Sequence, residues 1–262
     1  MVQLLWDYRG KRPVIAIGQF LFRFRNAIFP LVMLGAVLLA RPHYSFGNLG
    51  KDWLVDLAGI AMILAGQTLR VITIGYEYIR RGGRDGRVYA EGLVQGGVFA
   101  HCRNPLYLGN ILMAAGFLVV LGHGGLILIG VPLIVLTYAA IVSAEEDYLS
   151  RQFGDLYAAY QARVNRWIPR WHGFRRSIAP MRFNWQRVLV KEYNTSFAAL
   201  AGLLLIQTWT RVFEGDMSNG RWIITVGSGF VLLGGYLGVR VLKIPRELIG
   251  PLAAGPLSDE PP

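Results

Sequence analysis

The sequence has very few of the residues that form disulfides or bind metals. Cys102 is its only cysteine, which excludes an internal disulfide and a cluster of thiolate ligands. The histidines are far apart in the chain and lack the short spacing of paired ligands: His43, His101, His123 and His172. The sequence therefore predicts no metal site.

Charged residues are also scarce, at 16% of the 262 residues, while 53% are hydrophobic. Soluble domains carry about 25% charged residues. The apolar residues form runs long enough to cross a bilayer, and the mean hydropathy is +0.39. Acidic residues are fewer than basic ones, so the net charge is +11. Basic residues that flank apolar spans are explained by membrane orientation and anionic lipid, so we expect an integral membrane protein without a nucleic-acid partner.

Apolar segments predict an all-α fold, a polytopic bundle of about six transmembrane helices. The segments are approximately 27–40, 53–76, 106–121, 125–144, 195–212 and 222–242. The first and third are shorter than the roughly 20 residues that cross a hydrocarbon core. Flanking residues such as Phe20 and Phe24 are expected to extend the first.

The same segments suggest four regions. These are an N-terminal amphipathic segment with the first span (1–52), a core with three spans (53–170), a linker with two spans (171–246) and a tail (247–262). The tail is rich in proline, glycine and alanine, which predicts disorder.

The distribution of basic residues predicts the orientation of the spans. Successive connections between the spans lie on opposite faces of the membrane, so they form two sets. One set contains only four basic residues: Arg41, Lys51, Arg211 and Arg221. All the others outside the spans fall in the opposite set, which includes both ends of the chain. Because cytoplasmic loops are enriched in lysine and arginine, both termini are predicted to be cytoplasmic.

A very short connection, residues 122–124, joins the third and fourth spans. It forces them into an antiparallel hairpin. Arg103, which precedes the third span, should then meet Glu145, which follows the fourth, at the cytoplasmic face. A polar pocket is expected there.

Two short motifs flank this hairpin. In Arg103-Asn104-Pro105-Leu106-Tyr107, Pro105 suits the first turn of a helix and Asn104 is a favourable N-cap. A capped helix start with a snorkelling arginine explains Asn104 and Pro105 well, but it says less about Tyr107, which falls on the first turn where a ligand could lie. Glu145-Glu146 can likewise be the acidic start of a new amphipathic helix, and the opposing arginine favours a binding role.

Other polar and glycine residues near the spans have more than one explanation. Arg70 is predicted near the cytoplasmic end of its span, either snorkelling or facing the site together with Gln67. The glycine-rich stretch 82–86 follows a helix and not a strand, which argues against a dinucleotide-binding loop and favours a loop that covers a site. Gly234 and Gly238 form a GxxxG motif that suits packing within the chain or a homodimer.

The two motifs resemble those of the isoprenylcysteine carboxyl methyltransferase and phospholipid methyltransferase family. Residues 93–109 are similar to its glycine loop followed by Arg-His-Pro-x-Tyr-x-Gly. Residues 145–169 are similar to its Glu-Glu pair, followed here by Phe153-Gly154, Tyr157, Tyr160 and an Arg166-Trp-Ile-Pro stretch. The family's histidine is Asn104 in this chain, which cannot titrate near neutral pH.

This resemblance implies a membrane methyltransferase that uses S-adenosylmethionine without a Rossmann fold. It implies that the cofactor pocket is lined by Arg103, Asn104, Pro105, Tyr107 and Gly109 and closed by Glu145 and Glu146. Arg166, facing the acceptor, and Glu146 are the implied catalytic residues. The implied acceptor is lipophilic, a prenylcysteine-like carboxylate or a lipid head group that enters from the bilayer.

Two other classes compete with this assignment. Sterol and steroid reductases have a similar arginine-containing loop and use NADPH, but Pro105 and the Glu145-Glu146 pair favour the methyltransferase. A transporter or assembly protein is the non-enzymatic alternative. Transporters typically show interrupted helices and charges near the membrane midplane, and the sequence has few of either.

Overall fold

The computed structural model describes a predominantly helical chain. It covers residues 2–39, 49–77, 81–84, 87–90, 92–213 and 219–248. The elements are α1 (Val2–Leu39), α2 (Leu49–Tyr76), β1 (Arg81–Arg84), β2 (Arg87–Ala90), the 3₁₀ helix η1 (Gly97–Ala100), α3 (Pro105–Val120), α4 (Gly124–Arg163), α5 (Phe174–Ile178), α6 (Trp185–Phe213) and α7 (Asn219–Leu248). The predicted disordered tail lies, from residue 249 onward, outside the described residues.

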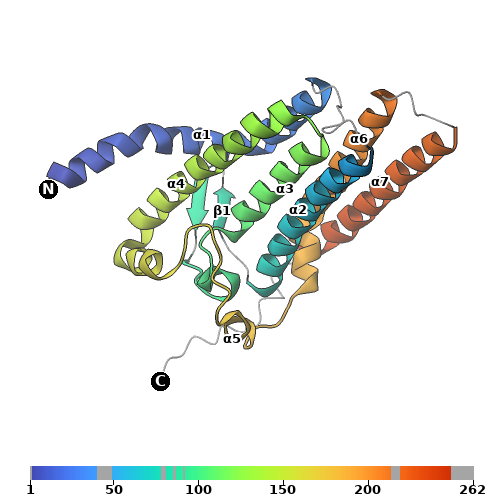
Figure 1. Ribbon diagram of the computed structural model, residues 1–262. Helices are drawn as coiled ribbons and strands as arrows, with labels where there is room; N and C mark the ends of the chain where they lie inside the picture. The colour runs from blue at the N-terminus through green and yellow to red at the C-terminus, as the bar shows by residue number, and fades with distance from the viewer. Residues whose placement is uncertain are drawn as a thin grey trace.

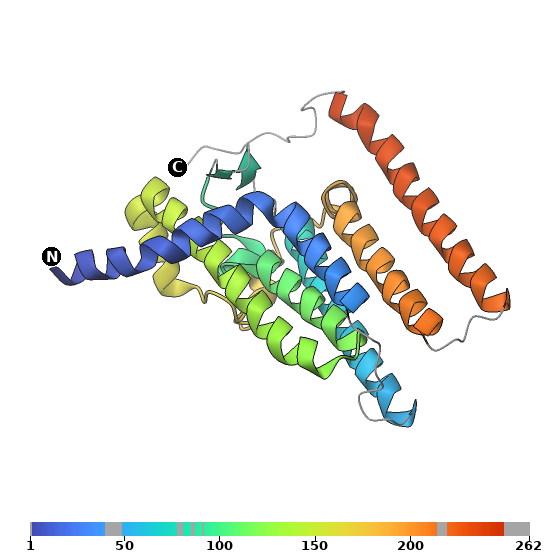
Figure 2. The same ribbon diagram turned by 90° about the horizontal axis from the view of Figure 1, so that it is seen from above.

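The centre of the fold is a layer formed by α4, α3 and α2. These helices run side by side, α1 crosses α4, and α6 packs beside α2 (Figures 1 and 2). Helix α7 packs against α6 and lies at the outer edge of the molecule, as Figure 2 shows. The main apolar core joins Val37 of α1, Ile63 of α2, Met113 of α3 and Ile206 of α6.

Glycines bring α2 and α3 into direct backbone contact. A Cβ added to Gly109 would lie 2.8 Å from the Gly66 carbonyl oxygen, and one added to Gly116 would lie 2.6 Å from that of Gly59. Each helix thus has two glycines seven residues apart that face the other helix. Small residues allow such close approach between membrane helices, so this contact fixes α3 on α2.

The prediction of an integral membrane protein agrees with the lengths and surfaces of the helices. Among the described residues, four stretches are long and apolar enough to cross a membrane: Trp53–Tyr76, Gly124–Arg163, Trp185–Phe213 and Trp222–Val241. A bent pair in α1, Pro13–Arg25 and Ala27–Leu38 at 79°, raises the number to five. Helix α3 has 16 residues. The structure thus places all six predicted segments in helices, although four or five qualify as complete spans.

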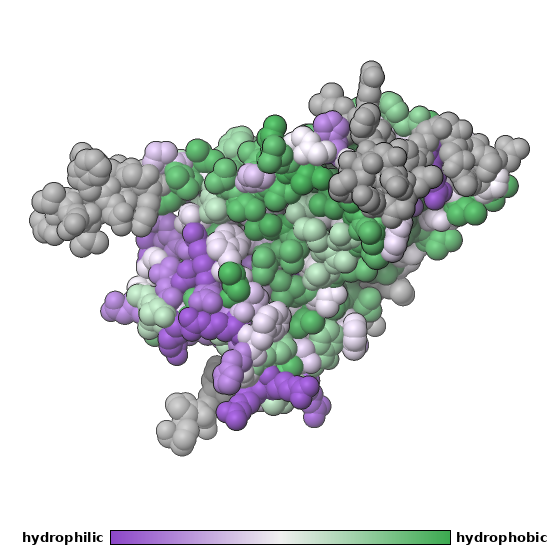
Figure 3. All heavy atoms as spheres, in the orientation of Figure 1, coloured by the Kyte–Doolittle hydropathy of each residue, from purple (hydrophilic) through white to green (hydrophobic). Residues whose placement is uncertain are grey.

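Hydropathy divides the surface into two regions. Apolar side chains cover the helices, while polar side chains gather around α5 and the far end of α4 (Figure 3). Large apolar residues are exposed on the helices, including Leu128 at 77% and Val231 at 75%. Apolar surface of this extent is rare on soluble monomers and suits contact with lipid.

Two elements differ from the sequence predictions. Helix α4 does not end at residue 144 but continues through Glu145-Glu146 to Arg163, with one non-helical residue at Gly154 (φ 49°). Residues such as alanine, glutamate and leucine favour helix, so nothing stops it at the membrane boundary. The stretch predicted as a loop contains a hairpin in which Gly82 pairs with Tyr89 and Gly83 with Val88. Its sequence signal is the dipeptide Asp85-Gly86, which is typical of hairpin turns.

Candidate functional site

Glu146 joins two arginines at the end of the hairpin formed by α3 and α4. Its carboxylate lies 3.3 Å from Arg103 Nε and 3.1 Å from Arg166 Nε. Arg166 also donates to Ser143 Oγ at 2.8 Å, and Arg103 donates to the Gln161 carbonyl at 3.1 Å. One carboxylate thereby connects the loop before α3, helix α4 and the segment after α4. We call Arg103, Glu146 and Arg166 the ionic cluster.

Main-chain bonds join the loop before α3 to the segment after α4. The Arg103 amide donates to the Asn165 carbonyl at 2.9 Å, and the Arg170 amide donates to the His101 carbonyl at 3.1 Å. Asn104 is the N-cap residue of α3, but its side chain makes no capping bond. It donates instead to Glu146 and to the Arg166 carbonyl, both at 3.3 Å. The predicted N-cap position of Asn104 is therefore confirmed, but the side chain bonds to the ionic cluster instead of to the first turn of α3.

Cys102 is completely buried in this junction. Its thiol donates to the Trp167 carbonyl at 3.1 Å. Burial raises the pKa of the Cys102 thiol from 9.0 to about 11, although a backbone hydrogen bond and the charge of Arg103 act in the opposite direction. Because the thiolate is the reactive form of cysteine, the native thiol should be inert near neutral pH.

We expect N-ethylmaleimide to modify native Cys102 at pH 7.5 at least about 100-fold more slowly than a small free thiol, since two pKa units reduce the thiolate about 100-fold. Modification in denaturing detergent should be fast, and mass spectrometry after timed quenching measures both rates. The raised pKa also contributes stability that is fully present below pH 9.0 and is lost as the pH rises through about 11. Equal rates in native and denatured protein would contradict this burial.

Tyr107 and Glu145 form a second polar contact, on another side of α4. The Tyr107 hydroxyl donates to Glu145 Oε1 at 2.6 Å and accepts from Arg25 Nη1 at 3.2 Å. Arg25 also lies over the Phe22 ring, 4.1 Å from its centroid. This contact attaches α1 to the hairpin through residues of opposite charge.

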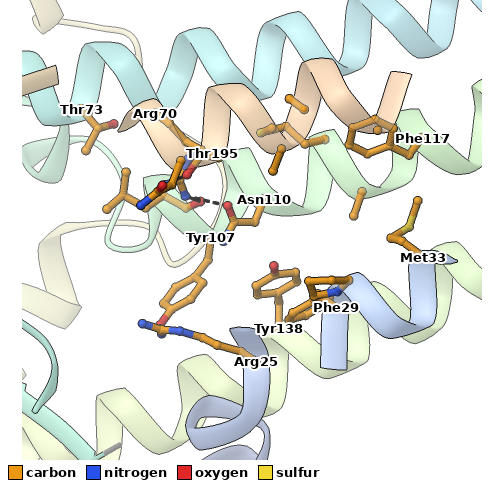
Figure 4. Close-up of a pocket in the computed structure, with 18 of the residues that line it drawn as sticks. Arg25, Phe29, Met33, Arg70, Thr73, Tyr107, Asn110, Phe117, Tyr138 and Thr195 are labelled. Carbon is orange, nitrogen blue, oxygen red and sulfur yellow. Dashed lines mark hydrogen bonds between the residues drawn. The ribbon is translucent and has the colours of Figure 1, made fainter. Parts of the chain in front are cut away.

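A cavity of about 850 Å³ lies between α1, α2, α3, α4 and α6. Ligand pockets typically measure about 300–1,000 Å³. Its polar lining residues are Arg25, Arg70, Thr73, Glu77, Asn104, Tyr107, Asn110, Glu145, Lys191, Asn194 and Thr195. Apolar residues, among them Phe29, Met33 and Phe117, line the rest. In Figure 4 these three residues lie on one side of Tyr138, and Arg25 and Tyr107 lie on the other side. The cavity therefore has a polar end and an apolar end.

Arg70 contributes to the polar end from α2. Its Nε and Nη2 atoms donate to the two Glu192 carboxylate oxygens at 2.9 and 2.6 Å. Its Nη1 atom donates to Asn110 Oδ1 at 2.6 Å (Figure 4). Glu192 is only 2% exposed. Arg70 therefore faces the interior in a paired arrangement, rather than snorkelling to the surface.

The structure divides the predicted site residues into three groups. Asn104, Pro105, Tyr107 and Glu145 line the cavity. Arg103, Glu146 and Arg166 form the ionic cluster beside it, and Gly109 packs against Arg70 and Gly66. Arg103 was predicted to meet Glu145, but its ionic partner is Glu146. Successive residues of a continuous helix point about 100° apart, so the two glutamates serve different contacts.

Several cavity residues lie outside the predicted motifs. Helix α1 contributes Arg25 and Phe29, the residue after α2 is Glu77, and α6 contributes Lys191 and Thr195. One signal for α6 was present in the sequence. Glu192 comes just before an apolar run, and a carboxylate there often marks a functional site. Hydropathy predicts that the fifth span begins at residue 195, so Glu192 falls in the predicted linker, whereas α6 begins at Trp185.

A comparison with known families covers the centre of this site. Residues 55–156 match the model of the phospholipid methyltransferase family. The matched segment begins within α2 and includes the loop before α3, all of α3, and α4 as far as residue 156, beyond Glu146. No curated protein and no solved structure matches the chain. The family found agrees with the resemblance of the two motifs, and the core of this membrane protein, residues 55–156, is therefore similar to a family of phospholipid methyltransferases.

Proposed function

We propose that the protein transfers a methyl group from S-adenosylmethionine to a lipophilic acceptor within the membrane. The observation that carries this proposal is the cavity with one polar and one apolar end. Asn104, Pro105, Tyr107 and Glu145, which belong to the two motifs, line its polar part. A polar donor and an apolar acceptor can meet in such a cavity without leaving it.

The polar end suits a donor that carries charges of both signs. S-adenosylmethionine, when bound, supplies an activated methyl group on a sulfonium and has an ammonium, a carboxylate and ribose hydroxyls. Glu77 and Glu145 can hold the ammonium or hydroxyls, and Arg25 and Lys191 can hold the carboxylate. These residues come from α1, α4 and α6 and from the residue that follows α2, so donor binding would connect four parts of the fold.

The ionic cluster would act by holding the frame of the polar end. Arg103 forms an ion pair with Glu146 and donates to the Gln161 carbonyl, so these contacts go to protein rather than to the cavity. Glu146 and Arg166 connect the loop that carries Asn104 to α4. In methyl transfer the protein mainly aligns the two reactants and excludes water. A rigid frame serves this purpose, and we assign Glu146 and Arg166 to it.

The apolar end suits the hydrocarbon part of the acceptor. Phe29 and Met33 of α1, Phe117 of α3 and Leu205 of α6 line it. Large apolar side chains are exposed on α1 and α6, among them Leu31 and Leu200, so an acceptor would reach the cavity from the bilayer between helices. Both termini and the polar end would then face the cytoplasm, as the basic residues predict.

Calorimetric titration of the detergent-purified protein tests this function. S-adenosylhomocysteine and NADPH are titrated separately into folded protein. We expect saturable binding of S-adenosylhomocysteine alone. Binding of NADPH alone would assign the protein to the reductases, and binding of neither would favour a non-enzymatic membrane protein.

A matched pair of variants locates the donor in the polar end. Glu145→Gln removes a cavity charge, and we expect about a tenfold loss of S-adenosylhomocysteine affinity because one charge-assisted hydrogen bond is lost. Asp155→Asn removes an exposed charge from the same helix and should leave the affinity unchanged. Equal affinities for both variants would move the donor away from Glu145.

A further inference from the structure

Arg70 lines the cavity, but its hydrogen bonds are already made to protein. Besides the bonds to Glu192 and Asn110, Nη1 donates to the Leu106 carbonyl at 3.3 Å and Nη2 to Thr195 Oγ1 at 3.4 Å. A guanidinium has five N–H groups, and within the described part of the chain these contacts engage all five. Arg70 therefore positions other residues and does not itself bind an anion.

One residue that Arg70 positions by a short hydrogen bond, of 2.6 Å, is Asn110. An arginine can only donate hydrogen bonds, so the atom of Asn110 that faces it must be the amide oxygen. This chemistry fixes the orientation of the amide, which geometry alone often leaves open. The NH₂ group of Asn110 then points away from Arg70, and both Asn110 and Tyr138 line the cavity.

Asn110 and Tyr138 lie where the polar and apolar ends of the cavity meet. Figure 4 shows the two side chains facing each other, with Tyr107 and Arg25 to one side and Phe29, Phe117 and Met33 to the other. The Asn110 NH₂ group can therefore donate hydrogen bonds into the cavity, and the Tyr138 hydroxyl can also donate one. The two residues together present N–H and O–H donors at this depth.

We propose that Asn110 and Tyr138 recognise an oxygen on the methyl acceptor, such as that of a carboxylate or carbonyl, and discriminate against an ammonium at the same depth. Glu192 and Arg70 are positioning residues, because they hold the amide that makes this recognition. An ammonium can only donate hydrogen bonds and would face donors here. This inference deepens the proposed function and rests on it for the identity of the ligand as methyl acceptor.

The discrimination can be measured with three single-chain probes of similar length. Dodecanoate, 2-dodecanone and dodecylamine are titrated into the detergent-purified protein, with and without S-adenosylhomocysteine. We expect the carboxylate and the ketone to bind at least tenfold more tightly than the amine. The ketone is uncharged, so its binding does not depend on attraction to Arg25 or Lys191. An amine that binds as tightly as the ketone would overturn the proposal.

Variants of Asn110 test the donor directly. Asn110→Leu removes the amide at similar volume, and we expect about a tenfold loss of ketone and carboxylate affinity with unchanged affinity for S-adenosylhomocysteine. Asn110→Asp replaces the donor with an acceptor and should reverse the preference in favour of the amine. Unchanged probe affinities in both variants would show that the amide does not contact the ligand.

A double variant separates positioning from mere stability. Arg70→Met combined with Glu192→Leu removes both buried charges, so neither is left unpaired, and such replacements are often neutral for stability. We expect a folded protein that has lost the oxygen preference, with no further loss on adding Asn110→Leu, because coupled residues are not additive. A folded double variant that keeps the preference would refute the positioning role.

The two proposals can fail separately. An oxygen preference without S-adenosylhomocysteine binding would leave the recognition by Asn110 and Tyr138 intact while the donor assignment falls. Donor binding without an oxygen preference would support the donor assignment and refute the recognition by Asn110 and Tyr138.

Discussion

Replacing Gly109 with valine is expected to lower the stability of the protein by roughly 3 kcal/mol, the upper part of the range for overpacking. A Cβ at this position would lie 2.6 Å from Arg70 Cγ and 2.8 Å from the Gly66 carbonyl oxygen. The carbonyl belongs to helix backbone and cannot turn aside, so α3 must move away from α2. That movement would also break the bond between Arg70 and Asn110.

The lone cysteine provides the measurement for this variant. Cys102 is buried in the native protein, so a thiol-reactive fluorogenic dye reports thermal unfolding through this single residue. We expect the unfolding midpoint of Gly109→Val to fall by several degrees or more, with a parallel loss of affinity for 2-dodecanone. Gly66→Val should behave similarly, because its Cβ would lie 2.5 Å from the Gly109 carbonyl oxygen.

Glycines of α7 supply the matched control. A Cβ added to Gly234 or Gly238 would have no described atom within 4 Å. Gly234→Val should therefore leave the unfolding midpoint of the monomer unchanged, although it makes the same chemical change within a membrane helix. Equal destabilisation by Gly109→Val and Gly234→Val would show that the contact between α2 and α3 is not as close as described.

The contrast between these glycines shows what the sequence could and could not predict about packing. Gly234 and Gly238 match the GxxxG spacing, which can be recognised within one segment of sequence. The glycines that pack, Gly66 and Gly109, lie on different helices, and their importance depends on which faces meet. Hydropathy locates apolar segments well, because long apolar runs are an unambiguous signal. It does not say which faces of two apolar helices will touch.

The candidate site could also be predicted only in part, because its contacts depend on which faces of the helices meet. The short turn at residues 122–124 correctly placed Arg103 near the glutamate pair, because two antiparallel helices must bring their far ends together. The choice between Glu145 and Glu146 depended on the rotation of α4, which continues where a helix end was predicted. Arg25 and Lys191 reach the cavity from helices outside the motifs, and no local pattern brings those helices to it.

Replacing Glu146 with glutamine should have an effect as large as that of Gly109→Val, for an electrostatic reason. Its carboxylate lies between Arg103 and Arg166, and neither Glu146 nor Arg103 is more than 12% exposed. Without this charge, two guanidinium groups would lie close together in a partly buried place. Removing one partner from a buried ionic contact typically costs about 3–5 kcal/mol, and we expect about 3 because Arg166 is one-third exposed.

The adjacent acid, Asp147, is the control that separates this role from a general need for negative charge on α4. Asp147 lies 2.7 Å from Arg151, whose side chain is 63% exposed, and exposed pairs of this kind contribute about 0–1 kcal/mol. Asp147→Asn should therefore leave unfolding and S-adenosylhomocysteine binding nearly unchanged. Glu146→Gln should impair both together, since the frame that holds Asn104 fails when the cluster does. A Glu146→Gln protein of normal stability that no longer binds the donor would instead place this carboxylate in direct contact with the ligand.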